Sequence, residues 1–252
     1  MVAQVTRMPG VNPVSAPQTL QNGAYTLGQP LCTLQDRTLF TAQQTGVDRP
    51  VLIERIAPIA PELAASAFMA RQAVLGFEQV NIAQALDVFV EDGALYTVMC
   101  AGAGVPMLNH AALTSQQAIT YGVDICNSLS YLARHHGHLD AADISPCTVF
   151  ITRADRARLT SMAALLGVHA SANNSRFVAR AGDGEQATVF SLGATLHYAL
   201  SGWAGSYHDD AAPALVGVSP EFNAVLAKAL AANPADRFTS ISQLRQALLR
   251  LQ

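Results

Sequence analysis

The chain has 252 residues, of which 50% are hydrophobic and 13% are charged. This composition excludes a disordered or fibrous protein and is sufficient for one large domain or two lobes. The formal net charge of −3 gives no reason to expect a nucleic acid or an anionic membrane as the partner. No apolar run approaches the roughly 18 to 20 residues that span a bilayer, so we expect no membrane segment within this chain.

The first hundred residues predict a leader followed by a small sheet. Residues 1–22 mix Pro, Gln, Ser, Val and Gly without a helical or strand period, and we expect them to form a disordered leader. Asp92 and Gly93 lie between two β-rich runs, which predicts a hairpin. A helix over 61–77 is inserted between the strands. The predicted strands are 24–31, 38–43, 51–56, 85–90 and 95–100.

From Leu113 onward the pattern indicates helices. Thr114 and Ser115 supply an N-cap to an apolar-periodic stretch, and a nearly all-apolar segment later in the chain should be a buried helix. Two amphipathic helices close the chain. The predicted helices are 115–135, 187–201, one starting at Ser219-Pro220 and one starting at Thr239 or Ser240. The fold class is therefore α+β, with a small five-stranded antiparallel sheet lobe and one helix over 23–100, then a mainly α-helical lobe over 101–252.

Several short motifs, taken in order, resemble the protein kinase fold and especially its bacterial serine/threonine branch. Asp143-Ile144-Ser145-Pro146 with Val149-Phe150-Ile151 resembles the catalytic loop and its following strand. The resemblance runs from about Tyr25 to the end of the chain and implies a two-lobed kinase-like fold. The other matching pieces are Tyr25-Thr26-Leu27, Leu39-Phe40-Thr41-Ala42, Leu95-Tyr96-Thr97-Val98-Met99, Phe190-Ser191-Leu192-Gly193-Ala194-Thr195-Leu196 and Asn233-Pro234-Ala235-Asp236-Arg237-Phe238.

The resemblance identifies the positions where a kinase binds nucleotide, and most of them are replaced. A kinase glycine-rich loop needs three positions without a side chain so that its backbone can fold over phosphates. Those positions are matched here by Cys32, Leu34 and Arg37. The strand lysine that pairs with the phosphates falls on Glu54, whose charge has the same sign as a phosphate. Leu52 replaces the small residue beside the adenine ring, and we expect it to fill that space.

The resemblance also implies that the magnesium ligands are lost. The aspartate of the Asp-Phe-Gly motif falls on Ser161, and the catalytic-loop asparagine falls on Thr148. Asp143 alone remains of the catalytic set, as a vestige without a phosphoryl group to act upon. We therefore expect no cofactor, no metal and no kinase activity.

One replaced position suggests a structural ion pair. In the resembled family the strand lysine pairs with a glutamate of the small-lobe helix, and that helix position falls on Arg71. The pair Glu54 and Arg71 would then have reversed polarity and could hold helix and sheet together, since an arginine can meet a carboxylate through two hydrogen bonds. The alternative is that both side chains point to solvent.

Two other residue groups admit a functional interpretation. His135, His136 and His138 suggest a metal site, but no further ligands complete a tetrahedral set, and histidines favoured by the helix dipole explain them better. Ser171 and Ser175 fall in the activation-segment region and could accept phosphate from a true kinase. A polar surface loop is the favoured alternative for them.

Arg237 is the next residue to which the resemblance gives a role. Arg237 is interpreted structurally, because the resembled family uses this arginine to hold the end of the activation segment through a glutamate. No Ala-Pro-Glu motif is recognisable around 180–185, so we expect different contacts here.

The four cysteines are scattered without a C-x-x-C pair, which favours reduced thiols. They are Cys32, Cys100, Cys126 and Cys147.

The resemblance leads to two functional hypotheses. The first is a catalytically inactive pseudokinase that acts as a protein-binding, scaffold or allosteric module in bacterial signalling. The second is a residual nucleotide-binding sensor or a weakly active atypical serine/threonine kinase that retains Asp143. For the first, the family suggests an active serine/threonine kinase or a phosphothreonine-reading domain as partner. The expected location is the cytoplasm, either alone or as the cytoplasmic part of a larger membrane protein.

Overall fold

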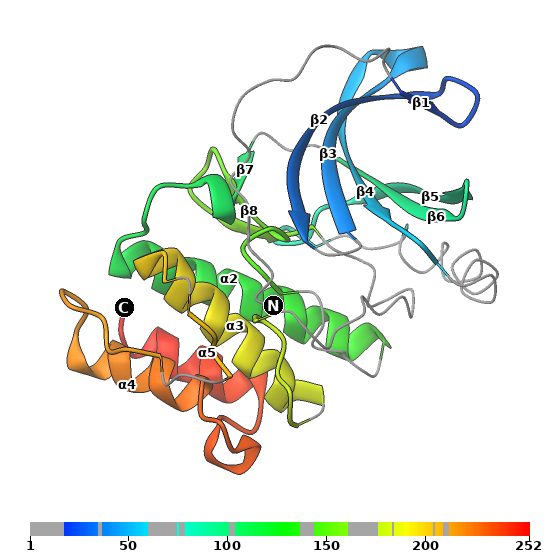
Figure 1. The fold of residues 1–252 in the computed structure, drawn as a ribbon. Helices are drawn as coiled ribbons and strands as arrows, with labels where there is room; N and C mark the ends of the chain where they lie inside the picture. Colours follow the sequence, from blue (N-terminus) through cyan, green and yellow to red (C-terminus); the bar gives the residue numbers. More distant parts are fainter. Residues whose placement is uncertain are drawn as a thin grey trace.

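The computed structural model describes residues 18–34, 37–59, 75, 79–100, 104–136, 144–160, 176–182, 184–203, 205–208 and 212–252. They form a curled antiparallel sheet beside a mainly helical part (Figure 1). The sheet holds six strands in the order β1-β2-β3-β4-β6-β5. Their bounds are Thr19–Leu20 (β1), Tyr25–Leu34 (β2), Arg37–Gln44 (β3), Arg49–Ile56 (β4), Ala85–Glu91 (β5) and Ala94–Cys100 (β6).

The five predicted strands are confirmed, and each is extended at one end or both. The β5–β6 turn has the predicted form, because Asp92 and Gly93 both have a positive φ, of 48° and 69°. Two consecutive residues of this kind match the twist of a two-residue hairpin. The predicted helix over 61–77 lies outside the described residues except for Leu75, which is helical.

The sixth strand corrects the predicted end of the leader. Thr19 and Leu20 pair with Thr26 and Tyr25 of β2, and the Leu27 amide donates to the Gln18 carbonyl at 2.9 Å. Leu20 is buried at 2% exposure, because its side chain belongs to an apolar cluster with Tyr25, Val51 and Tyr96 of the sheet. Residues 18–22 are therefore part of the fold, while residues 1–17 lie outside the described range.

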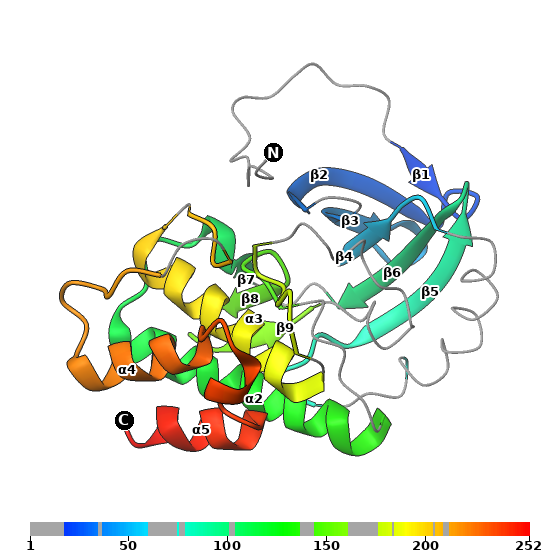
Figure 2. The same cartoon turned by 60° about the horizontal axis from the view of Figure 1, so that its bottom comes forward.

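The second part is built on helices, with a small sheet against one of them (Figure 2). That three-stranded sheet has the order β7-β8-β9, and only β8 was expected from the sequence. The remaining elements are Gly104–Pro106 (β7), Met107–Asn109 (η2), Ser115–His136 (α2), Val149–Thr152 (β8), Ala157–Leu159 (β9), Gly184–Ser201 (α3), Pro220–Ala229 (α4), Pro234–Asp236 (η6) and Ile241–Leu249 (α5). A short 3-10 turn in the first part, Thr45–Val47 (η1), joins β3 to β4.

The starts of the predicted helices α2, α4 and α5 are confirmed by their caps, whereas α3 begins at Gly184, three residues before the predicted start. The Thr114 hydroxyl accepts from the Gln117 amide, while the Gln117 side chain accepts from the Thr114 amide, so the two residues cap α2 reciprocally. Ser219 caps α4 by accepting from the Phe222 amide, and Ser240 caps α5 in the same way. These local bonds fix where each helix begins because they satisfy amides that have no partner within the helix.

The helical core forms where α2, α3 and α5 meet. Gly122 of α2 permits this approach, because a Cβ atom there would lie 2.8 Å from Leu248 Cδ1 and 3.0 Å from Leu196 Cδ1. α3 is buried along most of its length, as its apolar sequence predicted. Among the described residues, no helix is long and apolar enough to cross a membrane.

His197 of α3 is a buried, hydrogen-bonded histidine that links the helix to the loop after it. Its Nε2 lies 2.9 Å from the Pro213 carbonyl and its Nδ1 lies 3.0 Å from the Tyr207 hydroxyl. Since a carbonyl only accepts, Nε2 carries the proton and Nδ1 accepts from Tyr207. Burial lowers the pKa of His197, while the bond to the Pro213 carbonyl acts in the opposite direction.

This histidine predicts an acid-sensitive contribution to stability. Because its folded-state pKa is below the ordinary value of about 6.5, the unfolded chain binds a proton that the folded chain does not. The free energy of unfolding should therefore fall as the pH drops below about 6.5, and His197→Gln should weaken this dependence. Urea unfolding of both proteins from pH 7.5 to 5 tests it. Identical pH dependence in the two proteins would contradict it.

Candidate functional site

The positions that resemble a kinase nucleotide site lie where the larger sheet faces the β8 region. Cys32, Arg37, Leu39 and Glu54 of the sheet meet residues before β8 and after β9 around one small cavity. The cavity has a volume of about 10 Å³, which is at the lower limit for a single water molecule. The residues that complete its wall are Cys147, Thr148 and Thr160.

A buried ion pair occupies the sheet side of this cavity. Arg37 Nη1 lies 3.1 Å from Glu54 Oε1, and the two residues are 6% and 2% exposed. In the register of β3 and β4, Arg37 is opposite Ile56 and Glu54 is opposite Leu39. Arg37 and Glu54 are thus diagonal neighbours on one face of the sheet, a separation that two long side chains can bridge.

Arg37, which the sequence presents only as a replaced glycine, is the partner of Glu54 in this ion pair. Arg37 is the third position of the kinase-like loop, and its side chain points back to the carboxylate that stands at the lysine position. The two-residue alternation of the strands could have indicated this pairing. Arg37 lies on the same face of β3 as Leu39, and Glu54 lies on the same face of β4 as Ile56. Arg71, the partner predicted for Glu54, lies outside the described residues.

Apolar side chains pack together at the position that resembles the adenine side of a kinase site. Leu52 of β4 is 5% exposed and belongs to a cluster that also contains Met99 of β6 and Phe150 of β8. Leu39 and Ala83 complete the buried part of the cluster, and Leu31 and Cys32 pack against its edge. Because Phe150 comes from the helical part and the others come from the sheet side, this cluster joins the two parts where the resemblance predicts a nucleotide base.

The loop before β8 is held by its own hydrogen bonds. The Thr148 hydroxyl accepts from the Ser145 amide at 3.0 Å, and the Thr160 hydroxyl donates to the Thr148 carbonyl at 2.9 Å. Thr148 stands at the position of a kinase metal ligand, and its side chain is buried in this turn. Asp143 and Ser161, and the side chain of Leu34, lie outside the described part of the chain.

Two cysteines meet at the cavity, one from each side. Cys32 Sγ lies 3.7 Å from the Cys147 carbonyl oxygen. A hydrogen bond with the Cys147 side chain and burial both raise the pKa of Cys32, so the thiol stays protonated at neutral pH. The loop position at which a kinase has its first glycine therefore carries a side chain that touches the opposite wall. This contact lies where the resemblance predicts the phosphates of a nucleotide.

The only lysine of the chain lies far from this site in the fold. Lys228 is in the last turn of α4, and its ammonium group lies 4.8 Å from the centre of the Phe238 ring. It is therefore engaged in a cation–π contact on the helical part. No lysine takes the place that Glu54 occupies.

Arg237 lies at the junction of three chain segments. Its guanidinium donates to four backbone carbonyls, those of Ala231 at 2.7 Å, Ala232 at 3.1 Å, Ala181 at 2.9 Å and Gln186 at 3.4 Å. It also lies 4.9 Å from the centre of the Phe190 ring. The side chain is almost fully buried, and it ties the segment before α3 to the end of α4. Carbonyl oxygens thus take the place of the glutamate used in the resembled family.

The predicted histidine cluster is only partly described. His135 is exposed and stacks obliquely on Tyr131, with ring centroids 4.3 Å apart. The side chain of His136 and the whole of His138 lie outside the described residues, as do Ser171 and Ser175. Where the structure describes side chains, no three His, Cys, Asp or Glu residues are grouped as metal ligands would be.

Comparison with known proteins identifies the fold. No protein-family model matches the sequence, and no curated protein matches it significantly. Among solved structures, the PknI kinase domain of Mycobacterium tuberculosis matches with a TM-score of 0.70 and 20% identity, over 94% of this chain and 98% of that one. The apo form of PpkA-294 matches with a TM-score of 0.67 and 16% identity, over 93% and 99% of the two chains. The chain therefore has the fold of a protein kinase domain over nearly its whole length.

Proposed function

We propose that this chain is a pseudokinase, a kinase-fold domain without phosphotransfer activity that acts as a protein-binding, scaffold or allosteric module in bacterial signalling. The observation that carries the proposal is the buried ion pair of Arg37 and Glu54 in the place of the kinase loop glycine and strand lysine. A phosphate that approached Glu54 would meet a like charge. At about 4 Å and an effective dielectric constant near 20, two unit charges repel by about 4 kcal/mol, and the paired Arg37 offsets part of this repulsion.

The surroundings of the ion pair support the same proposal. The positive charge of Arg37 is matched by Glu54, so it offers little to a nucleotide. Leu52, Met99 and Phe150 pack together where an adenine ring would be inserted. ATP and magnesium could enter only if these side chains moved apart, which would expose apolar surface and separate a buried ion pair. Each of these steps opposes binding.

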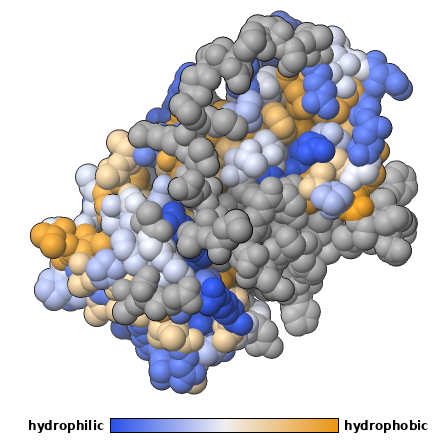
Figure 3. Space-filling view, viewed as in Figure 1, coloured by the Kyte–Doolittle hydropathy of each residue, from blue (hydrophilic) through white to orange (hydrophobic). Residues whose placement is uncertain are grey.

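The partner is proposed to be a protein. The face of the molecule seen in Figure 3 carries hydrophilic and hydrophobic residues side by side, and the structural neighbours named as kinase domains suggest a role beside active kinases. An active serine/threonine kinase and a phosphothreonine-reading domain are the proposed classes, in the cytoplasm of a bacterium.

A phosphotransfer assay tests the absence of activity. The purified chain is incubated with radiolabelled ATP, Mg²⁺ or Mn²⁺, and a general protein substrate, beside the Asp143→Asn variant. We expect the same background signal from both proteins, because Asp143 has no bound nucleotide to act upon. Incorporation of phosphate by the natural sequence that the Asp143→Asn variant lacks would instead support a weakly active atypical kinase.

A further inference from the structure

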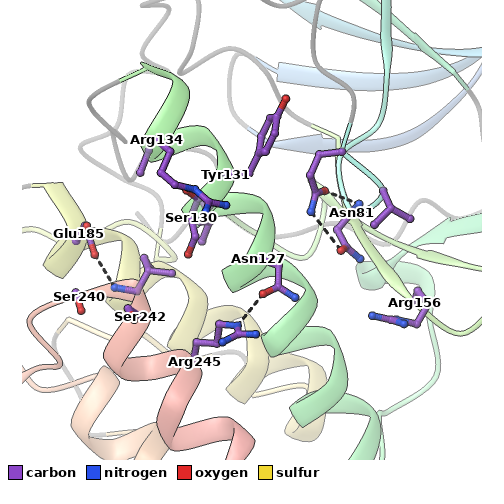
Figure 4. A pocket seen from close by; sticks show the side chains of 15 residues that line it. Asn81, Asn127, Ser130, Tyr131, Arg134, Arg156, Glu185, Ser240, Ser242 and Arg245 are labelled. Atoms are coloured by element: carbon purple, nitrogen blue, oxygen red, sulfur yellow. Dashed lines mark hydrogen bonds between the residues drawn. The ribbon is translucent and has the colours of Figure 1, made fainter.

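A second and much larger hollow lies on the helical part, outside the kinase-like site. It lies between α2 and the start of α5, has a volume of about 850 Å³, and is closed at one end by the turn before β5 (Figure 4). Its polar lining includes Asn127, Ser130, Arg134, Ser242 and Arg245. We call it the α2–α5 groove. Its open, concave shape differs from the closed cavity between the sheet and the β8 region.

Arginines surround the α2–α5 groove. Figure 4 shows Arg134 on α2 and Arg245 on α5 beside the space between these helices, and Arg156 at its other end. An adjoining hollow of about 340 Å³ shares Val80, Asn81 and Arg156 with the groove. Arg153 and Arg158 also line that second hollow. Five of the 15 lysines and arginines of the chain are therefore gathered on one face.

Acidic residues balance only part of this charge. Asp124 is fully buried and forms a two-point ion pair with the Arg156 guanidinium. Asp155 accepts from the Tyr121 hydroxyl, and Glu185 accepts from the Ile241 amide at the start of α5. Within the described part of the chain, five arginines beside three acids leave a positive excess here, on a chain with a net charge of −3. An anionic ligand is therefore favoured at this face.

Two of the arginines are oriented by bonds that leave their outer nitrogens available. Arg245 donates through Nε to the Asn127 side chain at 2.7 Å, and Arg134 donates through Nε to the Ser130 carbonyl at 3.1 Å. Among the described residues, no hydrogen bond engages the Nη groups of either side chain. A guanidinium held in this way loses less conformational entropy when it binds a carboxylate.

We propose that the α2–α5 groove binds an extended acidic segment of a protein partner. The inference rests on the proposed function, because it assigns a surface and a ligand class to the protein-binding module. A peptide fits better than a membrane, because the basic residues line a concave space rather than a convex face. Asn127, Ser130 and Ser242 add neutral hydrogen-bonding groups. Val80, which is 72% exposed between the two hollows, offers an apolar contact.

The test measures binding of a defined probe by fluorescence anisotropy. The probe is a labelled 12-residue peptide of Glu and Asp with two central leucines, and the comparison probe replaces every acid by Lys. We expect the full chain to bind the acidic peptide only, with an affinity that falls as salt is added. The Arg134→Glu/Arg245→Glu variant should bind about tenfold more weakly or worse, which corresponds to about 1.4 kcal/mol.

A matched control separates the groove from overall charge. Arg49→Glu/Arg55→Glu makes the same change of net charge on β4, outside both hollows, and should leave binding within about twofold. If the groove variant is destabilised, Arg153→Glu/Arg158→Glu on the β8–β9 hairpin replaces it, and an intermediate loss is expected. Equal weakening by groove and control variants would overturn the proposal, as would failure of the natural sequence to bind the acidic peptide.

The same variants distinguish a peptide from a lipid surface. In one alternative outcome, the natural sequence sediments with phosphatidylserine vesicles while the groove variant does not, and neither protein binds the peptide. This result would assign the arginines to a membrane and overturn the proposal. The nucleotide-binding experiments are independent of these peptide and vesicle experiments. A chain that binds ATP and also binds the acidic peptide through the groove would contradict the pseudokinase assignment alone. A chain that binds neither the nucleotide nor the acidic peptide would contradict this inference alone.

Discussion

Replacing Glu54 by alanine is expected to lower the free energy of unfolding by about 3 kcal/mol. The physical reason is that Arg37 would stay buried, at 6% exposure, after losing the carboxylate that lies 3.1 Å from its Nη1. Arg37→Ala should have an effect of similar size, because it leaves the Glu54 carboxylate buried. Urea unfolding of each variant measures the loss. Arg49→Ala, at an exposed position of β4, should change stability by less than about 0.5 kcal/mol.

A double-mutant cycle shows whether the loss belongs to the pair. Arg37→Met/Glu54→Met fills a similar volume without charge, and it should be destabilised far less than the sum of the two single methionine variants. A coupling energy indistinguishable from zero would contradict the buried pair. A second cycle with Arg71→Ala tests the partner predicted for Glu54 from the sequence.

Replacing Arg237 by alanine is expected to lower the free energy of unfolding by about 3 to 5 kcal/mol, because several hydrogen bonds from a charged donor are lost. The change removes four hydrogen bonds from a charged donor and leaves four carbonyls in a nearly closed environment, those of Ala181, Gln186, Ala231 and Ala232. The contact with the Phe190 ring is lost as well. Thermal and urea unfolding measure the effect, and a loss below about 1 kcal/mol would show that the junction is not held by this side chain.

The lysine variant is the informative control for Arg237. Lysine keeps the positive charge but has one compact ammonium group in place of a planar fork with five N–H donors. It cannot reach carbonyls on both the segment before α3 and the end of α4, so Arg237→Lys should recover less than half of the lost stability. Full recovery by lysine would mean that charge alone, rather than the geometry of the fork, stabilises the junction.

Much of the fold could be predicted from local sequence patterns. The Asp92-Gly93 turn, the reciprocal cap of Thr114 and Gln117, and the serine caps of α4 and α5 are short-range features that a sequence displays directly. The strands of the larger sheet were also visible as β-rich runs between turn signals. β1 was missed because two residues give no period, and its pairing with β2 depends on a tertiary contact of Leu20.

The site was harder to predict because its contacts join residues that are distant in the sequence. Replacement of the kinase lysine by Glu54 is visible in the sequence, but the pairing with Arg37 depends on the register of β3 with β4. The contact of Cys32 with Cys147 spans 115 positions and joins the two parts of the fold. The groove between α2 and α5 depends on helix packing, which no single periodic pattern specifies. The sequence identifies the substituted residues, but it does not show the contacts that their side chains make.

The Arg37–Glu54 ion pair and the apolar cluster around Leu52 have the same consequence for the stability of the fold. A kinase keeps its nucleotide site open at a cost in stability, because an apolar slot in its interior stays unfilled until the ligand binds. In this chain Arg37 and Glu54 compensate each other, and Leu52 packs with Phe150 across the two parts. We propose that protein side chains thereby complete the interior that a nucleotide completes in a kinase. The kinase fold can then be stable without the ligand.

The most direct test of this account is a thermal-shift titration with ATP and Mg²⁺. A ligand that binds only the folded state stabilises it by about 2.7 kcal/mol at a hundredfold excess over its Kd, which for a chain of this size raises Tm by roughly 5 to 10 °C. We predict a change within about 1 °C up to millimolar ATP, with an active kinase domain as the positive control. A saturable, magnesium-dependent rise in Tm would contradict the filled site.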